Sequence, residues 1–322
     1  MTIKIGFIGL GEHQLRAHLK HLIELKKQGY DIIFRGAFDP SLSAFSETKV
    51  SYGITLQPYA SAEALLNADI NTVFIASPDE FHTDQLEMAV TKGHHVFCEK
   101  PISQTSDDIV KLHNILNLAH TKGLVITTCH PRRFDPPFIY LKNGMSDLQQ
   151  QFGDLKHFDF SFWYHEVTDA WKKNRSLLSD HFGHEIDIYR FLFGPPNIEV
   201  RKNSDSYDGY ETTGVSDKGP SFRFFGSRAL KENVYHETIR LDFQKASVFV
   251  FLNSGGGIVL PEGKALAFPK IDYDERFMSV NKNFIDTING KAKNYLSEDD
   301  IICNNSLSVD LTEKGWGKYP PS

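Results

Sequence analysis

The sequence predicts an α/β protein in which an N-terminal domain with a parallel sheet is followed by an α+β domain. Over the first 128 residues, short β-branched runs alternate with helical stretches, which is typical of βαβ units. Beyond residue 134 strands and helices are mixed, and two adjacent runs read as antiparallel strands. We therefore expect the second domain to contain a largely antiparallel, open sheet. The predicted domains are residues 1–128 and 129–322.

In the N-terminal domain, apolar periodicity and glycines that follow helices define the elements. Strands are expected at 3–8, 31–38, 72–75, 95–98 and 124–128, and helices at 12–28, 60–67, 83–92 and 106–122. In the second domain, helices are expected up to about residue 151 and at 179–193 and 277–288, with strands at 155–164, 237–243 and 246–252. The segment 202–227 is rich in Ser, Asp and Gly, and we expect it to be a long loop.

Composition excludes several classes of protein. The chain has 322 residues, 40% hydrophobic and 24% charged, with a net charge of −6 and no sizeable basic run, which argues against a nucleic-acid partner. Its three cysteines are too few for a disulfide framework. No apolar stretch is long enough to span a membrane, and the start of the chain reads as a strand instead of a signal peptide. We expect a cytoplasmic protein with no membrane partner.

A glycine turn suggests a dinucleotide site. Gly9-Leu10-Gly11 lies between the first predicted strand and helix. The first glycine of such a turn permits the tight bend, the second lets the backbone approach a pyrophosphate, and the helix N-terminus supplies N–H donors. Gln14 stands where a third glycine would complete the fingerprint, so the turn by itself is weak evidence. In this context it predicts a Rossmann domain.

Asp39 ends the second predicted strand, where a carboxylate can bind the ribose hydroxyls of a dinucleotide. The alternative is that Asp39 caps a turn before Pro40, and the two interpretations have similar weight. No Lys or Arg directly follows Asp39, which favours NAD as the cofactor and leaves NADP possible.

Two segments are more specific: Val73-Phe74-Ile75-Ala76-Ser77-Pro78-Asp79-Glu80-Phe81-His82 and His94-His95-Val96-Phe97-Cys98-Glu99-Lys100-Pro101. They resemble the (T/S)-P-(N/D)-x-x-H and E-K-P motifs of the glucose–fructose oxidoreductase/inositol dehydrogenase/MocA family. The resemblance continues at Arg132-Arg133-Phe134 and over 180–195. It implies a Rossmann domain, followed by a domain whose open sheet assembles a homodimer or homotetramer. With the glycine turn, it gives the predicted cofactor-binding set Gly9, Gly11, Glu12, His13, Gln14, Asp39, Ser77, Pro78, His82, Glu99 and Lys100.

The resemblance also implies that Lys100 lies near the nicotinamide and the substrate hydroxyl. A partly desolvated ammonium can hold that hydroxyl and favour its alkoxide-like form. The alternative is a solvated surface lysine. Lys100 follows a buried strand, at the carboxyl edge of the parallel sheet where ligands bind, which favours the functional interpretation.

Asp180, His184 and Asp187 lie at i, i+4 and i+7 and share one face of a predicted helix. Taken alone, such a row is usually a solvated polar face. A metal site built from His181, His184 and the aspartates lacks a further ligand cluster, so we expect no metal. The resemblance implies that Asp180 and His184 are the catalytic pair, because Leu178, Asp180, His184 and Asp187 match the family pattern G-G-G-x-L-x-D-x-G-x-H-x-x-D.

The chain departs from that pattern where Asn174-Arg175-Ser176 replace three glycines and Phe182 replaces a fourth. Side chains at these positions should reshape the pocket. The predicted substrate-binding residues are His130, Arg132, Trp171 and Arg175, whereas Arg133 is expected to pair within the structure. We expect an NAD(P)-dependent oxidoreductase acting on a secondary alcohol of a sugar, cyclitol or related polyol. The alternatives are a non-catalytic dinucleotide-binding regulator and an NAD-using glycoside hydrolase.

Overall fold

The computed structural model describes residues 1–165, 176–194, 197–206, 208–230 and 235–320, and they form two compact units. The first unit contains Met1–Pro131 and Asp274–Asn305, and the second contains Arg132–Tyr273 and Ser306–Ser322. The predicted boundary after residue 128 lies near the end of the first stretch. It does not account for Asp274–Asn305, which packs with the N-terminal unit although it is distant in sequence.

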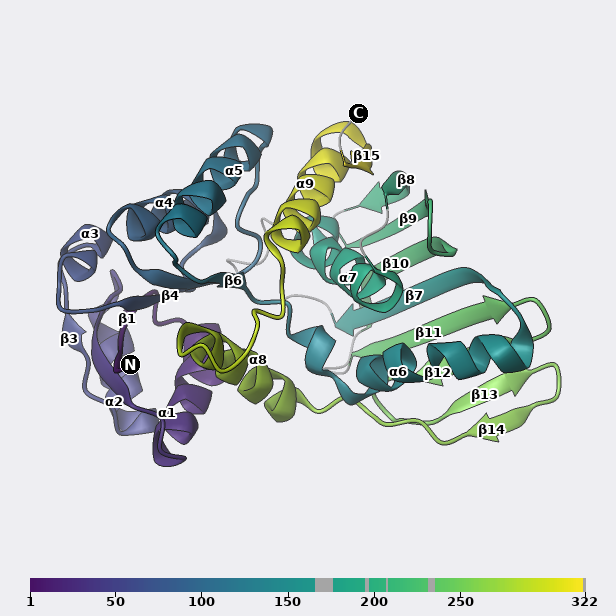
Figure 1. Cartoon of the computed structure of the whole chain (residues 1–322), viewed down its shortest axis with the longest axis horizontal. Coiled ribbons are helices and arrows are strands. Elements are labelled where there is room, and N and C mark those ends of the chain that lie inside the picture. The colour runs from purple at the N-terminus through teal and green to yellow at the C-terminus, as the bar shows by residue number, and fades with distance from the viewer. Residues whose placement is uncertain (166–175, 195–196, 207, 231–234, 321–322) are drawn as a thin grey trace. The chain divides into compact units, whose positions relative to one another are not determined.

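The first unit is built on a six-stranded sheet in the order β3-β2-β1-β4-β5-β6, and every neighbouring pair is parallel. Its strands are β1 (Ile3–Ile8), β2 (Ile32–Phe38), β3 (Gln57–Pro58), β4 (Thr72–Ile75), β5 (His95–Cys98) and β6 (Ile126–Thr128) (Figure 1). This is the strand order of a doubly wound Rossmann sheet. The order reverses at β1, so the carboxyl ends of β1 and β4 mark the edge where such sheets bind ligands.

The helices of the first unit follow the prediction closely. They are a π-helix (Gln14–Leu19), α1 (Lys20–Lys27), α2 (Leu42–Tyr52), α3 (Ala62–Leu66), α4 (His82–Thr91), α5 (Ser106–Thr121) and, from the distant stretch, α8 (Tyr273–Ile288). Thr105 and Asp108 form a reciprocal capping box that starts α5. Helix α2 and strand β3 were not predicted, because their residues carry little apolar periodicity and are mostly exposed.

Aromatic side chains join α8 to the sheet of the first unit. Phe74 of β4 and Phe97 of β5 stack with ring centroids 5.0 Å apart, and both are fully buried. Phe284 of α8 meets both rings edge-on, at 5.5 and 5.4 Å. Such pairs add to the free energy gained by burying apolar area. They explain why Asp274–Asn305 belongs to this unit.

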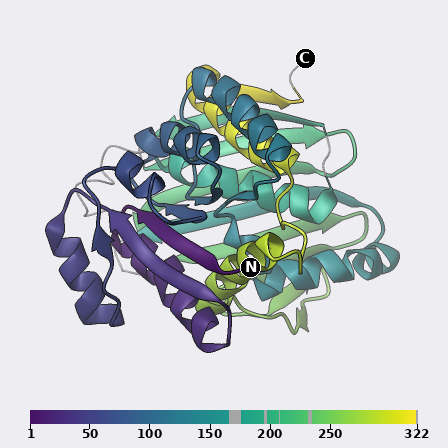
Figure 2. The ribbon, with the colours of Figure 1, turned by 60° about the vertical axis from the view of Figure 1, so that its left-hand side comes forward.

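The second unit contains a nine-stranded sheet in the order β14-β13-β12-β11-β7-β10-β9-β8-β15. Its strands are β7 (Leu155–His165), β8 (Ile198–Ser206), β9 (Gly209–Ser216), β10 (Ser221–Leu230), β11 (His236–Phe243), β12 (Ser247–Phe251), β13 (Gly257–Leu260), β14 (Lys264–Leu266) and β15 (Trp316–Tyr319). Strands β7 and β10 pair in parallel, and the other pairs are antiparallel. Helices α6 (Pro136–Phe152) and α7 (Leu177–Phe193) lie on one face of this sheet (Figures 1 and 2). The predicted fold class is confirmed.

The expected loop at 202–227 is wrong, because the structure places β9, most of β10 and part of β8 there. Along β10 the residues alternate between buried and half-buried, with Phe222 and Phe224 in the core. Tyr210 and Thr212 are the buried positions at the start of β9. Polar residues on the half-exposed face gave the segment a loop-like composition, although its alternation has the period of a strand.

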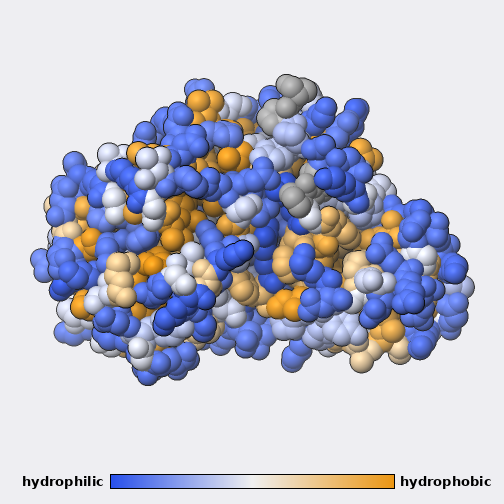
Figure 3. All heavy atoms as spheres, in the orientation of Figure 1, coloured by the Kyte–Doolittle hydropathy of each residue, from blue (hydrophilic) through white to orange (hydrophobic). Residues whose placement is uncertain are grey.

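Helix α9 (Glu298–Lys314) begins in the first unit and ends in the second, since the division between the units falls after Asn305. Among the described residues, no helix is both long and apolar enough to cross a membrane. On the face shown in Figure 3, hydrophobic residues form small patches among hydrophilic ones.

A buried histidine in α1 gives the fold a predicted pH dependence. Burial, reinforced by nearby Lys20, lowers the pKa of His21 to about 4. In the unfolded chain the pKa is near 6.5, so the unfolded state binds this proton first. The contribution of neutral His21 to the free energy of unfolding is therefore fully present above pH 6.5. It decreases as the pH falls toward 4, and the total decrease is up to about 3 kcal/mol.

We expect this effect to be visible as a difference between the wild type and His21→Phe, which keeps a ring against Phe277. Urea unfolding at pH 7 and pH 4.5 should show a smaller loss of stability in the variant, because other titrating groups are common to both proteins. Equal losses in the two proteins would contradict the assignment.

Candidate cofactor and active site

The glycine turn after β1 has the geometry that a dinucleotide requires. Gly9 has a φ of +86°, and a Cβ atom there would lie 2.6 Å from the carbonyl oxygen of Ala76, so only glycine fits. At Gly11 a Cβ atom would meet nothing within 4 Å, and the helix begins at the next residue. Open space beside Gly11 and free N–H groups at the helix start fit a pyrophosphate.

Asp39 follows β2 and faces this turn. One carboxylate oxygen accepts a hydrogen bond from the Leu10 backbone N–H at 2.7 Å, and the other accepts from Ser41 N–H at 2.7 Å. The second contact is the turn cap considered from the sequence. A carboxylate has about four acceptor sites, so these two bonds leave capacity for ribose hydroxyls. The cap and the cofactor interpretation are therefore compatible.

Gln14 fills the place of the third glycine as a buried side chain. It is 1% exposed, and neither atom of its amide has a hydrogen-bond partner among the described residues. Gln14 therefore differs from the third glycine of the fingerprint by placing a buried polar amide at this position. Glu12 and His13, by contrast, are exposed at the start of the helix.

The segment after β4 is held in place by contacts of the His82 ring with the backbone. Its ring is 1% exposed, with Nε2 2.9 Å from the carbonyl oxygen of Ser77 and Nδ1 2.8 Å from that of Pro101. The hydroxyl of Ser77 donates to Gln85 at 2.7 Å, and Pro78 is exposed. Because both ring nitrogens of His82 are engaged with backbone, we assign it a positioning role: it ties the Ser77 loop to the Lys100-Pro101 loop.

Glu99 and Lys100 follow β5 and differ sharply in environment. The Glu99 side chain is buried and contacts two histidines, with its Oε1 atom 3.0 Å from His13 Nε2 and 2.7 Å from His18 Nε2. Burial raises the pKa of the Glu99 carboxyl, but the histidines outweigh burial and hold that pKa well below its usual range. Lys100 is partly exposed, and its peptide bond to Pro101 is cis. Lys100 is thus half-buried, at the carboxyl end of a central strand.

In the second unit, Ser176 caps the start of α7 by accepting from the Ser179 N–H. The row Asp180, His184 and Asp187 is not a uniformly solvated face. Asp187 is 1% exposed, and Arg133 donates to it at 2.7 Å, which is the internal pairing expected for Arg133. Asp180 and His184 are partly exposed, and an Asp180 oxygen lies 3.7 Å from an Arg228 nitrogen.

A buried polar network beside this row was not anticipated from the sequence. Arg132 donates to both carboxylate oxygens of Glu237, at 2.5 and 2.6 Å, and the Glu237 side chain is fully buried. Burial lowers the pKa of the Arg132 guanidinium, but Glu237 outweighs burial and the pKa ends above its ordinary value. Arg132 was predicted to bind substrate, and its contacts are those of an internal ion pair.

The network extends through His181. Its Nε2 atom lies 3.1 Å from Arg132 Nη2 and its Nδ1 atom 2.8 Å from Glu185, so the ring accepts from the arginine and donates to the carboxylate. The Tyr210 hydroxyl also donates to Glu185. Burial, and then Glu185, raise the pKa of Tyr210 well above its usual value. The His181 ring stacks on Phe162 and stands edge-on to His184, at 3.8 and 5.4 Å between centroids.

The predicted catalytic residues are thus divided between the units: Lys100 belongs to the first, and Asp180 and His184 belong to the second. His130 is in the first unit and is buried. Its backbone N–H donates a hydrogen bond to the Tyr295 hydroxyl at 3.0 Å. Trp171 and Arg175 lie outside the described residues.

Comparison with known proteins finds similarity to NAD-binding oxidoreductases. Residues 3–129 match the model of an oxidoreductase family with an NAD-binding Rossmann fold. The uncharacterized oxidoreductase YhhX of Escherichia coli K12 is 25% identical over 361 residues, covering 100% of this chain and 98% of that protein. The inositol 2-dehydrogenase of Rhizobium meliloti is 25% identical over 202 residues, covering 62% of this chain and 58% of that enzyme. A levoglucosan dehydrogenase in complex with NADH shares the fold, with a TM-score of 0.81 at 16% identity over the whole of both chains.

The strand order and the glycine turn are those of a dinucleotide-binding Rossmann domain. The matched segment contains the E-K-P motif and the Ser77-Pro78 segment. Residues 3–129 match the Gfo/Idh/MocA model of NAD-binding oxidoreductases, as the motifs of that segment predicted, and the match covers less than half of the chain.

The two glycines of the turn should respond differently to substitution. Gly9→Ala places a methyl group against the Ala76 carbonyl at a positive φ, so we expect it to destabilise the fold by about 1–3 kcal/mol. Gly11→Ala meets no neighbour in the protein, so its stability should stay close to that of the wild type. Its methyl group would instead crowd the pyrophosphate, at a cost of about 1–3 kcal/mol, or roughly 5–150-fold in Kd for NAD.

Thermal unfolding and calorimetric titration with NAD test this pair of variants, each serving as the control for the other. Unchanged NAD affinity in a stable Gly11→Ala protein would remove the turn from the cofactor site.

Proposed function

We propose that the protein is an NAD-dependent dehydrogenase that oxidises a secondary alcohol of a sugar, cyclitol or related polyol, or catalyses the reverse reduction. The observation that carries the proposal is the cofactor turn: open space beside Gly11, the helix start and Asp39 form a cradle suited to a dinucleotide. The inositol 2-dehydrogenase relative supports the polyol class of substrate.

Three side chains carry the proposed chemistry on the substrate. Lys100 holds the reacting hydroxyl and stabilises its alkoxide-like form, because an ammonium favours developing negative charge. His184 takes the hydroxyl proton as the general base. Asp180 orients His184 and favours its protonated form, as a carboxylate near an imidazole does. NAD held at the glycine turn would supply the hydride acceptor.

Asp39 supports NAD over NADP. Its carboxylate lies at the strand end where the ribose of a dinucleotide binds, and a 2′-phosphate there would meet a like charge. The following residues Pro40, Ser41 and Leu42 supply no cation to offset that repulsion.

The proposal is tested by a screen of the purified protein with NAD or NADP against a panel of polyols and sugars, following reduced nicotinamide by absorbance. We expect turnover with at least one polyol and a higher kcat/KM with NAD. Tight NAD binding with no turnover on any polyol or sugar would favour the regulator instead. Glycoside cleavage without net NADH would identify the hydrolase.

A further inference from the structure

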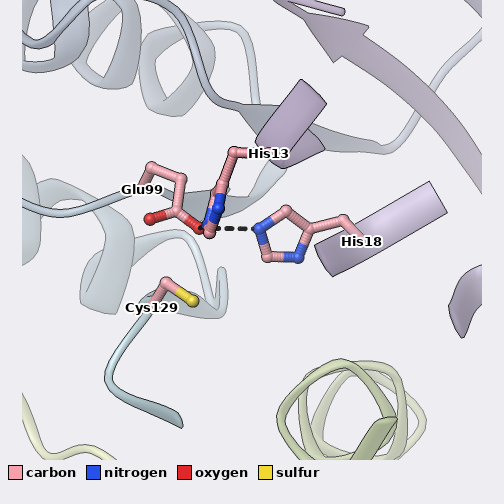
Figure 4. A group of neighbouring side chains, drawn as sticks. All are labelled: His13, His18, Glu99 and Cys129. Carbon is pink, nitrogen blue, oxygen red and sulfur yellow. Dashed lines mark hydrogen bonds and ion pairs between the residues drawn. The ribbon is translucent and has the colours of Figure 1, made fainter. Parts of the chain in front are cut away.

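Four side chains of the first unit meet in one group: His13, His18, Glu99 and Cys129 (Figure 4). One donor atom from each lies within 4.8 Å of all the others. The histidines come from the N-terminal helix, the glutamate follows β5 and the cysteine follows β6. His18, Glu99 and Cys129 are buried, whereas the His13 side chain is 44% exposed. The group is therefore enclosed in the protein and reachable from the side of His13.

The two histidines converge because the helix that carries them is a π-helix over Gln14–Leu19. Residues five apart, such as His13 and His18, lie more than 120° apart around an α-helix, whereas the wider π-turn brings them close to one face. Their rings stand edge to face with centroids 5.9 Å apart. π-Helical turns are rare and occur frequently at functional sites. Here the distortion directs both Nε2 atoms at the same oxygen of Glu99.

Asn281 determines which nitrogen of the His18 ring carries a proton. The amide Nδ2 of Asn281 donates to the carbonyl oxygens of Ala17 and Phe277, at 2.8 and 2.7 Å, which orients its Oδ1 toward the His18 ring. His18 Nδ1, at 3.0 Å from that oxygen, must therefore donate. A neutral ring then leaves a lone pair on Nε2, facing a carboxylate oxygen 2.7 Å away. That contact needs either a proton between the two atoms, carried by the imidazole or by the carboxyl group, or a metal ion that both atoms bind.

We propose that His13, His18, Glu99 and Cys129 bind a divalent ion of the zinc class. Two imidazoles, a carboxylate and a thiolate are a donor set typical of four-coordinate zinc, and magnesium or calcium would not select the sulfur. In tetrahedral zinc sites the donor atoms lie roughly 3.3–3.8 Å apart. The present separations run from 2.7 Å to at most 4.8 Å, so modest side-chain shifts reach that geometry.

The surroundings suit such an ion. A metal-binding imidazole usually donates its other N–H to an oxygen, as His18 does to Asn281. Phe97 and Phe74 pack near the His18 ring, with centroids 4.7 and 5.6 Å from it, and this apolar shell limits access by water. The site differs from the expectation that the protein binds no metal, which rested on sequence spacing alone. It does not depend on the proposed dehydrogenase function.

The test uses untagged full-length protein, freed of metal with a chelator and then loaded with Zn²⁺ or Co²⁺ and desalted. We expect one ion per chain by elemental analysis. The cobalt protein should show the intense visible bands of four-coordinate Co²⁺ and a near-ultraviolet thiolate-to-cobalt band. Cys129→Ser should abolish the thiolate band, and Asn281→Ala should weaken zinc affinity by about 10–100-fold, the usual effect of losing a partner that orients a ligand.

Cys303→Ser and His21→Phe are the matched controls, because each alters a buried side chain of the same unit outside the group. Both should bind zinc as the wild type does. The proposal is overturned if the wild type retains no ion, or if the thiolate band survives in Cys129→Ser. It is equally overturned if zinc binding is unaffected by His18→Ala in a protein whose circular dichroism is unchanged. If that variant does not fold, the spectrum of the wild-type cobalt protein alone decides, since octahedral bands without thiolate character exclude this site.

Discussion

Lys100→Met is expected to lower kcat for alcohol oxidation by about 10²–10³-fold, the usual cost of removing a group that stabilises developing oxyanion charge. Methionine keeps the length and apolar character of the side chain and removes only the ammonium. Lys100 is partly exposed, so the fold should tolerate the change. Steady-state kinetics with NAD and the best polyol from the screen give the measurement.

His184→Ala should lower kcat by about 10²–10⁴-fold, as expected for loss of a general base. Lys111→Met and His113→Ala, both at exposed positions of α5, are the matched controls and should keep wild-type rates. The affinity for NAD should change far less than kcat in the His184 variant, because that side chain is assigned to the substrate. Wild-type turnover in either the Lys100 or the His184 variant would remove that residue from the mechanism.

Glu237→Ala is expected to reduce the free energy of unfolding by about 3–5 kcal/mol, the cost of leaving a buried charge without its partner. Arg132 donates to both oxygens of Glu237, and both side chains are buried, so water cannot replace the carboxylate. The change would also disturb His181, whose Nε2 accepts from the same guanidinium. Urea or thermal unfolding measures the loss.

The pair Arg201–Glu199 on β8 provides the control, since its side chains are 73% and 39% exposed. Glu199→Ala should change stability by at most about 1 kcal/mol, because exposed ion pairs are screened by water. The double variant Arg132→Met/Glu237→Leu should recover much of the lost stability, since it removes both charges. A Glu237→Ala protein as stable as Glu199→Ala would show that this ion pair is not a principal stabilising contact.

The fold was predictable where its signals are local. Each central strand of the Rossmann sheet reads as a short apolar run, and glycines such as Gly29 and Gly93, both with positive φ, end the intervening helices. The prediction of a loop at 202–227 was wrong because it relied on composition and overlooked the alternation. The half-exposed face of β10 carries the polar residues Ser221, Arg223 and Ser227. The attachment of α8 to the first unit depends on contacts between residues about 200 positions apart, which have no local signature.

The candidate site also has parts that local sequence signals predict and parts that they do not. The glycine turn and Asp39 could be located from the sequence, because strand, turn and helix follow one another along the chain. Arg132 could not be assigned, since its partner Glu237 is distant in sequence and approaches only through the pairing of β7 with β11. The π-helix could not be predicted for another reason. The 12–28 segment has ordinary helical periodicity, and the contacts of His18 with Glu99 and Asn281 join residues that are distant in sequence.

The discontinuous first unit also bears on how the protein is made. While the ribosome is still synthesising the chain, a nascent segment that ends near Pro131 has all six strands but lacks Phe284, which covers Phe74 and Phe97. Those two rings would stay in contact with water, or with chaperones, until Asp274–Asn305 emerges. The segment that family comparison recognises, residues 3–129, is thus shorter than the unit that completes its own core. An excised cofactor domain would have to carry Asp274–Asn305 through a designed linker.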